Sequence, residues 1–480
     1  MKKVLANISL LAILAMPLSG CSLFLKEKAQ KKGAVEQMTL NYYRFGDDAE
    51  VIKPLLDSYQ TAHPGLTIRL FTQFPSYAQY EDQIINEMAE GGGPDLFSAP
   101  NAWIYKHQKK IAPLPTDMMS VDQFRQTFVA VADRDLVRPD GGTPAALRIY
   151  GIPLFIDTLA LYFNKKQYED RLPSKGGPSV MWKDFAQDAT TLTKSDNSPE
   201  RFEVAGAALG RVDNVRNGLD VLYSLFLQYG VSFYNPQGSA TTLSSAQSLA
   251  DDNSGNPFLT SLQFFTNFAV SSSSQYSWNQ YMATANGDKE ITPFAKGKVS
   301  TIAGYSSDYA KIAAMSDALS RQGYKALTPK DIGVAPLPQV HDPAVSANAR
   351  SVLASYMFET VSRNSTHQKQ AWDLLQFLSN QQNSTYYHQK THRPTSRRDL
   401  LDTQAAEPIY GVFAKQVGFA SSMPLYDIQA FNTIFSDAVQ GVADGLTSPV
   451  AAFKTADMNL GQILPQKGFV GPGPHVLVTK

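Results

Sequence analysis

Residues 66–98 read LTIRLFTQFPSYAQYEDQIINEMAEGGGPDLFS and carry the clearest structural pattern in the chain. The run Leu66–Phe71 resembles a short strand. Residues 77–90 repeat apolar side chains at helical spacing until Gly91-Gly92-Gly93-Pro94 ends the pattern, and residues 95–98 resemble another short strand. A strand, a helix and a strand in succession are typical of a βαβ unit, whose strands lie parallel in one sheet.

A further strand and helix are predicted before this unit. Met38–Tyr43 is a strand-like run, and residues 47–50 have the spacing of a capping box ahead of an apolar helical pattern that continues to Tyr59. Pro54 interrupts that pattern, because proline lacks the backbone N–H and clashes with the preceding turn. We therefore expect the helix to start late or to kink at Pro54.

The pattern changes after this first α/β region. Residues 150–164 (YGIPLFIDTLALYFN) form one apolar extended stretch, too long for a single ordinary strand, and we interpret it as a crossing from one domain into another. The later elements are predicted as a mainly helical region over 180–290, strands over 299–303, 332–336 and 352–361, and an amphipathic helix over 366–378.

The size and charge of the chain exclude several classes of function. The 480 residues contain 43 basic and 43 acidic side chains, so there is no general field to attract nucleic acid or an anionic membrane surface. A chain of this length and 43% hydrophobic composition can bury a large core, and we expect two or more domains.

The N-terminus reads as an export signal. Two lysines precede the apolar run 4–14, which is too short for an ordinary spanning helix. The tetrapeptide Leu18-Ser19-Gly20-Cys21 resembles a bacterial lipobox, in which the cysteine is acylated, and it contains the only cysteine of the chain. We predict a signal peptide over 1–20, a lipidated Cys21 with a tether over 21–37, and anchorage on the extracytoplasmic face of the cell membrane. A plain signal peptide with an incidental cysteine is the alternative.

Seven short motifs occur in an order that is similar to that of a known family. They are His63-Pro64-Gly65, residues 80–92 followed by Pro94-Asp95-Leu96-Phe97, residues 150–153 followed by 161–165, and residues 182–185, 294–298, 332–338 and 371–375. This order resembles the extracellular solute-binding proteins of family 1, the ABC-importer receptors that include maltose-binding protein. The resemblance covers residues 38–445.

The resemblance implies a two-lobed α/β fold of the periplasmic-binding-protein type II. Each lobe would hold a mixed, mostly parallel sheet flanked by helices, and several hinge crossovers would join the lobes. Lobe 1 would contain residues 38–152 and 350–394, lobe 2 residues 158–347 and 395–467, and residues 468–480 would form a tail. Lobes that are tied by two or three strands can rotate as rigid bodies around a ligand.

Ligands of open α/β sheets bind beyond the carboxyl ends of the strands, which selects a set of candidate binding residues. These are Tyr43, Arg44, Asp47, Asn101, Asp157, Arg211, Asp213, Asn214 and Tyr305, with Tyr426 as further aromatic surface. Asp157 resembles an acidic sugar-contacting position of maltose-binding protein. That relative has a stacking tryptophan where this chain has Tyr305, so Tyr305 would have to replace it. The alternatives are a packing role for the tyrosines, a helix cap at Asp47 and a solvated pair of Arg211 with Asp213.

We therefore expect a non-catalytic receptor that captures a sugar or oligosaccharide and delivers it to a membrane permease. No cofactor or metal is predicted, since His388 and His392 lack the intervening glutamate of a zinc motif. The partners would be the solute, the permease subunits and the membrane, and the protein would be a monomer without nucleic acid. The alternatives are a receptor for a non-sugar solute, a lipid-anchored carbohydrate-active enzyme and a surface scaffold protein.

Overall fold

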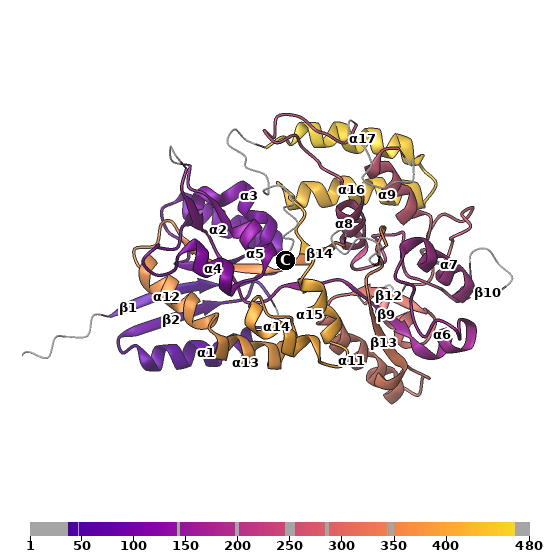
Figure 1. Ribbon diagram of the computed structural model, residues 1–480, viewed down its shortest axis with the longest axis horizontal. Helices are drawn as coiled ribbons and strands as arrows, with labels where there is room; N and C mark the ends of the chain where they lie inside the picture. The colour runs from indigo at the N-terminus through magenta and orange to yellow at the C-terminus, as the bar shows by residue number, and fades with distance from the viewer. Residues whose placement is uncertain are drawn as a thin grey trace, which may run out of the picture.

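The computed structural model describes residues 37–465 except 47, 142–144, 197–200, 245–254, 284–287, 343 and 345–349. The predicted signal peptide, Cys21 and the C-terminal tail lie outside these residues. The fold has two α/β lobes, which Figure 1 shows side by side, with β1 and β2 in one lobe and β9, β12 and β13 in the other.

Lobe 1 is built on one six-stranded mixed sheet. Its strands run in the order β2-β1-β3-β15-β4, with β7 beside β15; they are β1 (Met38–Tyr43), β2 (Leu66–Phe71), β3 (Leu96–Pro100), β4 (Ile111–Ala112), β7 (Ile152–Pro153) and β15 (Met357–Ser362). β1 pairs in parallel with both β2 and β3, as the βαβ pattern predicts. β15 comes from a distant part of the chain and pairs antiparallel with β3.

Helices and a short hairpin surround this sheet. They are α1 (Ala49–Ala62), α2 (Tyr77–Ala89), α3 (Ile104–His107), α4 (Val121–Thr127), α5 (Ala130–Leu136), α12 (Gln368–Leu378), α13 (Gln381–Thr391), the 3-10 turns η1 (Asn101–Trp103) and η2 (Gln108–Lys110), and the hairpin of β5 (Val137–Pro139) with β6 (Leu147–Ile149).

The local sequence explains where α1 and α2 begin and end. In α2 the Ser76 side chain accepts a hydrogen bond from the Gln79 amide, and Gly91 and Gly93 after the helix adopt positive φ angles of 86° and 93°. α1 begins after Asp48 and contains Pro54. The Asp48 carboxylate makes no cap hydrogen bond, because it is bonded to Arg44 instead, and Asp47 lies outside the described residues.

Lobe 2 is built on β9 with one antiparallel strand on each side. The sheet contains β9 (Ala160–Asn164), β12 (Thr301–Gly304) and β13 (Ile332–Pro336), and a separate pair joins β10 (Lys194–Ser195) to β11 (Phe202–Val204). Its helices are α6 (Lys165–Arg171), α7 (Trp182–Leu192), α8 (Gly218–Tyr229), α9 (Pro257–Thr266), α10 (Ile291–Ala295) and α11 (Asp308–Arg321), with the turn η3 (Pro329–Asp331). The pairing is antiparallel rather than parallel, because β12 and β13 both run against β9.

The described part of the chain crosses between the lobes in more than one place. Residues 150–164 are buried throughout; they leave β7 in the first sheet, form β8 (Asp157–Thr158) and enter β9 in the second, as the apolar stretch predicts. The stretch 352–361 is two strands rather than one, because Tyr356 separates β14 (Val352–Ser355) from β15. β14 pairs with β8 and with β16 (Ala420–Ser421). The lobe boundaries given above remain a prediction.

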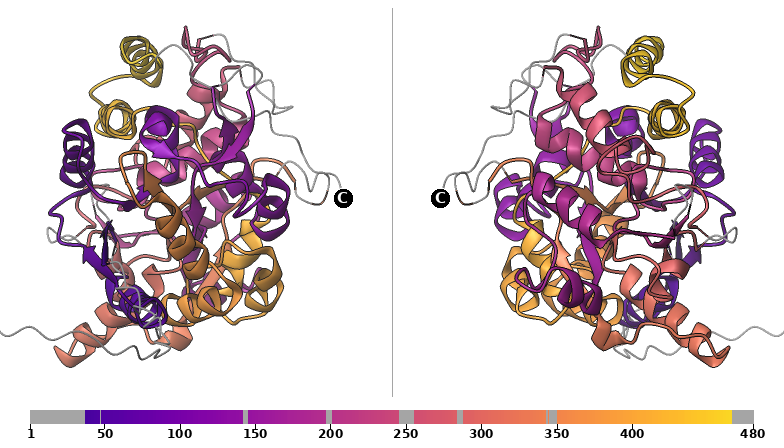
Figure 2. Two further views of the ribbon diagram at one scale, coloured as in Figure 1. Left: turned by 90° about the vertical axis from the view of Figure 1, so that its left-hand side faces the viewer. Right: turned by 90° about the vertical axis from the view of Figure 1, so that its right-hand side faces the viewer.

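The C-terminal helices complete the fold. They are α14 (Arg398–Ala405), α15 (Gly411–Val417), α16 (Ile428–Ala443) and α17 (Pro449–Gln462). α16 and α17 lie together beside α9, and Figure 2 shows this pair at the upper edge of the molecule. Phe226 of α8, Phe258 of α9 and Phe435 of α16 pack with ring centroids 4.9 to 5.6 Å apart, which fixes these helices to lobe 2. In the described part of the chain, no helix has the length and apolar character that a membrane span requires.

Candidate functional site

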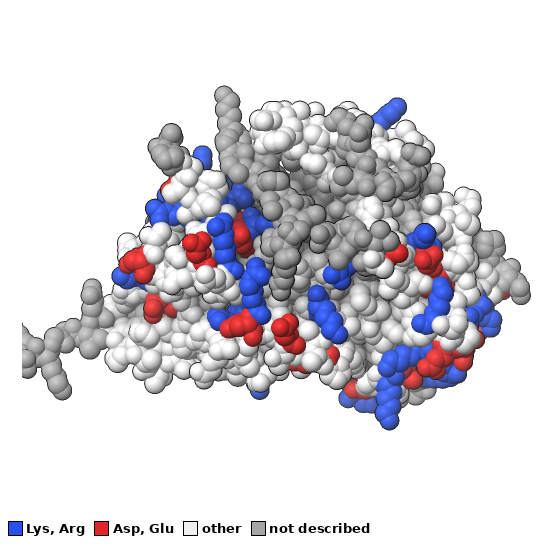
Figure 3. Space-filling view, viewed as in Figure 1, with Lys and Arg blue, Asp and Glu red and all other residues white. Residues whose placement is uncertain are grey.

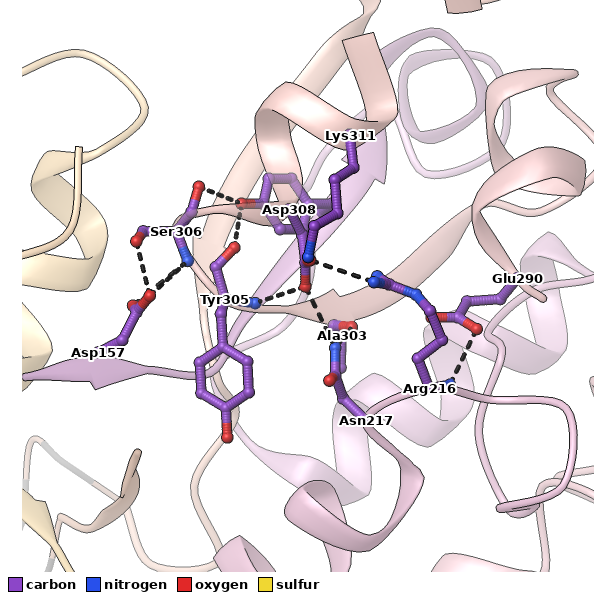
Figure 4. A network of polar contacts seen from close by, with 10 residues as sticks. Asp157, Arg216, Asn217, Glu290, Ala303, Tyr305, Ser306, Asp308 and Lys311 are labelled. Carbon is purple, nitrogen blue, oxygen red and sulfur yellow. Dashed lines mark hydrogen bonds and ion pairs between the residues drawn. The ribbon is translucent and has the colours of Figure 1, made fainter. Parts of the chain in front are cut away.

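The candidate site lies where the crossover strand β8 meets the loop between β12 and α11. Asp157 of β8 is 4% exposed and accepts hydrogen bonds from the Ser306 amide at 3.2 Å and from the Ser306 hydroxyl at 2.6 Å. The Thr158 amide donates to the same carboxylate at 2.9 Å. Figure 4 shows Asp157 reaching the loop from the crossover side. Asp157 therefore ties the crossover to the loop that carries Tyr305.

A second set of contacts holds the same loop from the lobe 2 side. The Tyr305 amide donates to the Asp308 carboxylate at 3.0 Å, and the Tyr162 hydroxyl donates to the Tyr305 carbonyl at 2.7 Å. Asp308 is itself paired with Arg216 at 3.2 Å and with Lys311 at 3.0 Å. The backbone of the loop is thus fixed, while Figure 4 shows the Tyr305 ring pointing away from Asp308 and Arg216.

The hydroxyl at the end of the Tyr305 side chain lies beside polar side chains from two other elements. This hydroxyl donates to Asp220 of α8 at 2.9 Å, and the side chain of Ser355 at the end of β14 acts on it electrostatically. One turn further along α8, the Tyr223 hydroxyl donates to Asn432 of α16 at 2.8 Å. β8, β14, the loop before α11, α8 and α16 therefore contribute neighbouring polar side chains at the junction of the lobes.

Burial controls the electrostatics of this site. Burial raises the pKa of Asp157 to about 6, although the hydrogen bonds from Ser306 work in the opposite direction. Burial likewise raises the pKa of Asp220 to about 6, against the hydrogen bond from Tyr305. For Asp308, burial alone would raise the pKa, but the charges of Arg216 and Lys311 lower it overall. Asp157 and Asp220 accept hydrogen bonds from neutral groups, whereas Asp308 forms ion pairs with cations.

Several predicted residues lie in other, well-bonded positions. Arg44 is 2% exposed and forms ion pairs with Asp48 at 2.6 Å and Glu359 at 2.5 Å. Tyr43 points toward the other face of β1 and packs against Phe71, with ring centroids 4.9 Å apart. Burial raises the pKa of Tyr43 to about 12, with a hydrogen bond to Glu87 adding to the shift.

The three predicted residues of the loop before α8 are divided between two sets of contacts. Arg211 is bidentate to Asp213, with both bonds 2.9 Å long, and also pairs with Asp444 after α16 at 2.8 Å. Asn214 is buried; it accepts from the Trp278 indole at 2.9 Å and donates to the Asn279 carbonyl at 2.9 Å. Both sets of contacts connect parts of lobe 2 to one another.

Asn101 and Tyr426 lie where lobe 1 meets the segment before α16. The Asn101 amide donates to the Ser422 hydroxyl at 2.6 Å. Tyr426 lines a groove of about 370 Å³ between α2, α3 and the start of α16, together with Trp103 and the ion pair of Lys106 with Asp427. Of the ten predicted binding residues, the structure thus brings Asp157 and Tyr305 together, and Asp47 lies outside the described residues.

Sequence reasoning missed Asp220, Tyr223 and Asn432. The first two lie in the apolar run that forms α8, and Asn432 lies between buried phenylalanines of α16. Polar side chains at these positions within an apolar run were the available signal. For metal binding, no group of three or more His, Cys, Asp or Glu side chains converges among the residues that the structure describes. His388 bonds instead to Glu407 at 2.9 Å, and His392 stacks on Tyr410.

The chain belongs to a family of binding proteins. Residues 45–384 match the family described as bacterial extracellular solute-binding protein. Such proteins are of the ABC-importer type, and the two-lobed fold agrees with that membership. No curated protein matches the chain.

Solved structures with the same fold carry sugar-related names. The chain is similar to the sugar-binding protein MalE from Xanthomonas citri, with 17% identity, a TM-score of 0.69, and coverage of 89% of this chain and 97% of the other. A cyclo/maltodextrin-binding protein complexed with maltotetraose gives 18% identity, a TM-score of 0.65, and coverage of 90% and 98%. A solute-binding protein from Thermotoga lettingae bound with α-D-tagatose gives 17% identity and a TM-score of 0.63, with coverage of 88% of this chain and 99% of the other. At these identities the likeness establishes the fold.

Proposed function

We propose that this protein captures a sugar or oligosaccharide between its two lobes and delivers it to the permease of an ABC importer. The observation that supports this most is the Tyr305 ring, which a network of hydrogen bonds holds beside Asp220 at the junction of the lobes. Sugars offer hydroxyl groups that both donate and accept, and C–H faces that pack on aromatic rings. An immobilised tyrosine beside a carboxylate suits both kinds of contact.

The expected affinity suits a protein that must release its ligand. A disaccharide has about 23 heavy atoms, and roughly 0.3 kcal/mol per atom gives a binding free energy of about 7 kcal/mol, or a Kd near 10 μM. Release to the permease is then feasible without chemical change of the ligand. The named neighbours that bind sugars add support to this choice of ligand class.

The proposal includes attachment to the membrane through Cys21. An acylated cysteine would anchor the protein on the extracytoplasmic face, where a monomer could reach the permease subunits. One acyl chain binds a bilayer only marginally, at about 10⁴ M⁻¹, so firm anchoring needs two or more chains. Figure 3 shows acidic and basic side chains interspersed among the described residues of the face in view, so the charged residues seen there do not gather by sign.

Thermal shift of the non-lipidated mature chain against a panel of sugars tests ligand capture. At 100 times the Kd, ligand binding stabilises the native state by about 2.7 kcal/mol, which raises Tm measurably. We expect Tyr305→Ala to abolish the shift. The control Tyr281→Ala removes a tyrosine that is 62% exposed and should leave the shift unchanged.

Three further outcomes would contradict the proposal or part of it. A shift with peptides and none with any sugar would replace the sugar by another solute. Chromatographic recovery of a chemically altered sugar after incubation would indicate catalysis instead of transport. Equal losses in Tyr305→Ala and Tyr281→Ala would remove Tyr305 from the site.

A further inference from the structure

The cationic side chains around the candidate site already have acidic partners. Arg216 is paired with Glu290 and Asp308, each at 3.2 Å, and Lys311 is paired with Asp308. Arg393, the cation whose charge acts on Asp157, lies 3.8 Å from Asp48 and stacks over the Phe155 ring at 4.8 Å. Arg44 and Arg211, which the strand-end rule also selects, are each paired with two acids. Each of these cations thus has an acidic partner, which weakens it as a partner for a ligand anion, and the Arg216 nitrogen without a hydrogen-bond partner among the described residues, Nη2, is buried.

Asp220 differs from these paired acids. Its partner in the described part of the chain is the neutral Tyr305 hydroxyl, which donates to Oδ2. Oδ1 has no hydrogen-bond partner among the described residues, and the side chain is partly exposed. A carboxylate oxygen can accept two hydrogen bonds, so Asp220 retains acceptor capacity beside the Tyr305 ring.

The surrounding charges increase this imbalance. Asp157 is also balanced by neutral donors, namely Ser306 and Thr158. The network around Tyr305 therefore contains four carboxyl groups, those of Asp157, Asp220, Glu290 and Asp308, against the cations Arg216 and Lys311, while Arg393 acts on Asp157 from its position beside Asp48. The fixed charge that a ligand meets beside Tyr305 is negative.

We propose that Asp220 makes the site selective by ligand charge, so that neutral sugars and amino sugars are admitted while uronates and sugar phosphates are rejected. This inference rests on the proposed function, because it names the class of sugar that the same site takes. A sugar hydroxyl or ammonium group can donate to Asp220 Oδ1. A carboxylate or phosphate there would face an unpaired like charge in a partly buried site, which is an effective means of rejecting a ligand.

The ionisation of Asp220 agrees with this role. Burial raises its pKa to about 6, which leaves the carboxylate mostly ionised at pH 7.5. The titratable groups that interact with the Asp220 carboxylate are Tyr305, Tyr223 and Asp308. Measurements at pH 7.5 therefore examine the charged form.

Isothermal titration of the non-lipidated mature chain with matched saccharide sets tests the proposal. Each set contains one scaffold, from glucose, galactose, mannose and their 1,4-linked disaccharides, as the neutral sugar, the 2-amino sugar, the uronate and the 6-phosphate. For any scaffold that binds, we expect the neutral and amino forms to bind at least tenfold more tightly than the two anionic forms. Asp220→Asn keeps an acceptor for the Tyr305 hydroxyl and should reduce that ratio at least fivefold.

The control variant is Asp437→Asn on α16, which removes an exposed acid with the same change in net charge. It should leave the ratio unchanged. Anionic forms that bind the wild type as tightly as neutral forms would overturn the inference while sugar capture stands. Equal ratios in Asp220→Asn and Asp437→Asn would overturn the role of Asp220. Absence of binding by every sugar would instead overturn the proposed function and this inference with it, and the wild-type ratio remains informative even if Asp220→Asn fails to fold.

Discussion

Two buried carboxylate clusters of this protein have opposite partners. In lobe 1, Arg44 bridges Asp48 and Glu359, with all three side chains at most 4% exposed. At the junction of the lobes, Asp157 is equally buried, but its partners are the amide and hydroxyl of Ser306. In the first cluster a cation offsets one of the two negative charges, whereas no cation of the described residues forms an ion pair with Asp157.

The pKa values reflect this difference. Burial acts to raise the pKa of both Asp48 and Asp157, but the charge of Arg44 lowers the pKa of Asp48 overall. The hydrogen bonds from Ser306 only partly offset burial at Asp157, and its pKa is raised to about 6. We infer that the ion pairs of Arg44 stabilise lobe 1, while Asp157 makes the junction of the lobes respond to pH near 6.

The largest effect is expected when the lobe 1 cluster loses its cation. Arg44→Met leaves Glu359 buried without its cation and Asp48 with the more distant Arg393, and it should lower the free energy of unfolding by about 3–5 kcal/mol. Denaturant unfolding, monitored by circular dichroism, measures this loss of free energy. The control Lys53→Met breaks the exposed ion pair with Asp57, whose side chains are 63% and 55% exposed, and should cost at most about 1 kcal/mol. Equal losses in the two variants would remove the distinction between buried and exposed pairs.

Asp48 of the first cluster and Asp157 of the second are also expected to respond in opposite directions to acid. An Asp157 pKa that is raised to about 6 means that the folded state binds a proton more tightly than the unfolded state, whose pKa is near 3.9. The stabilisation from Asp157 is therefore absent near pH 7.5 and is gained as the pH falls through 6 toward 4. Asp48, with its lowered pKa, contributes stability above about pH 4 that is lost in stronger acid.

Asp157→Asn tests this response. The wild type should gain roughly 1.4 kcal/mol relative to Asp157→Asn between pH 7.5 and pH 5, because pH 5 lies about one unit below the raised pKa and one pKa unit corresponds to about 1.4 kcal/mol. Unfolding at pH 7.5, 6 and 5 gives the difference, with Asp437→Asn as the exposed control of equal charge. A stability difference that stays constant over this pH range would show that the pKa of Asp157 is not raised in the folded protein.

The sequence predicted the order of elements well because local patterns determine them. Met38–Tyr43 and Leu66–Phe71 are strands as predicted, and the helix predicted over 77–90 is α2. Which strands become neighbours was less accessible. β15 inserts next to β3 from more than 250 residues away, and no periodicity in either strand encodes that pairing.

The candidate site shows a similar limit. The strand-end rule located the end of β1 but could not give side-chain direction, so it selected Tyr43 and Arg44 although they point to opposite faces of the strand. The rule did locate Asp157, which lies in the short strand β8, and Tyr305, which directly follows β12. Asp220 was missed because its contact with Tyr305 joins residues 85 positions apart, and only the fold brings them together.

The smallest effect is expected at an exposed ion pair that connects lobe 1 to α16. Lys106 and Asp427 lie 2.6 Å apart, with side chains 36% and 30% exposed. Lys106→Ala breaks this pair but leaves Asp427 to cap α16 through the Ala430 amide, so the variant isolates the ion pair. Such a pair contributes about 0–1 kcal/mol and is screened by salt. We expect Tm to fall slightly in dilute buffer and the difference to vanish at high ionic strength. A large fall in Tm that persists at high salt would mean that contact between the lobes depends on this pair. Exposed charges would then matter as much for stability as the charges of the buried clusters.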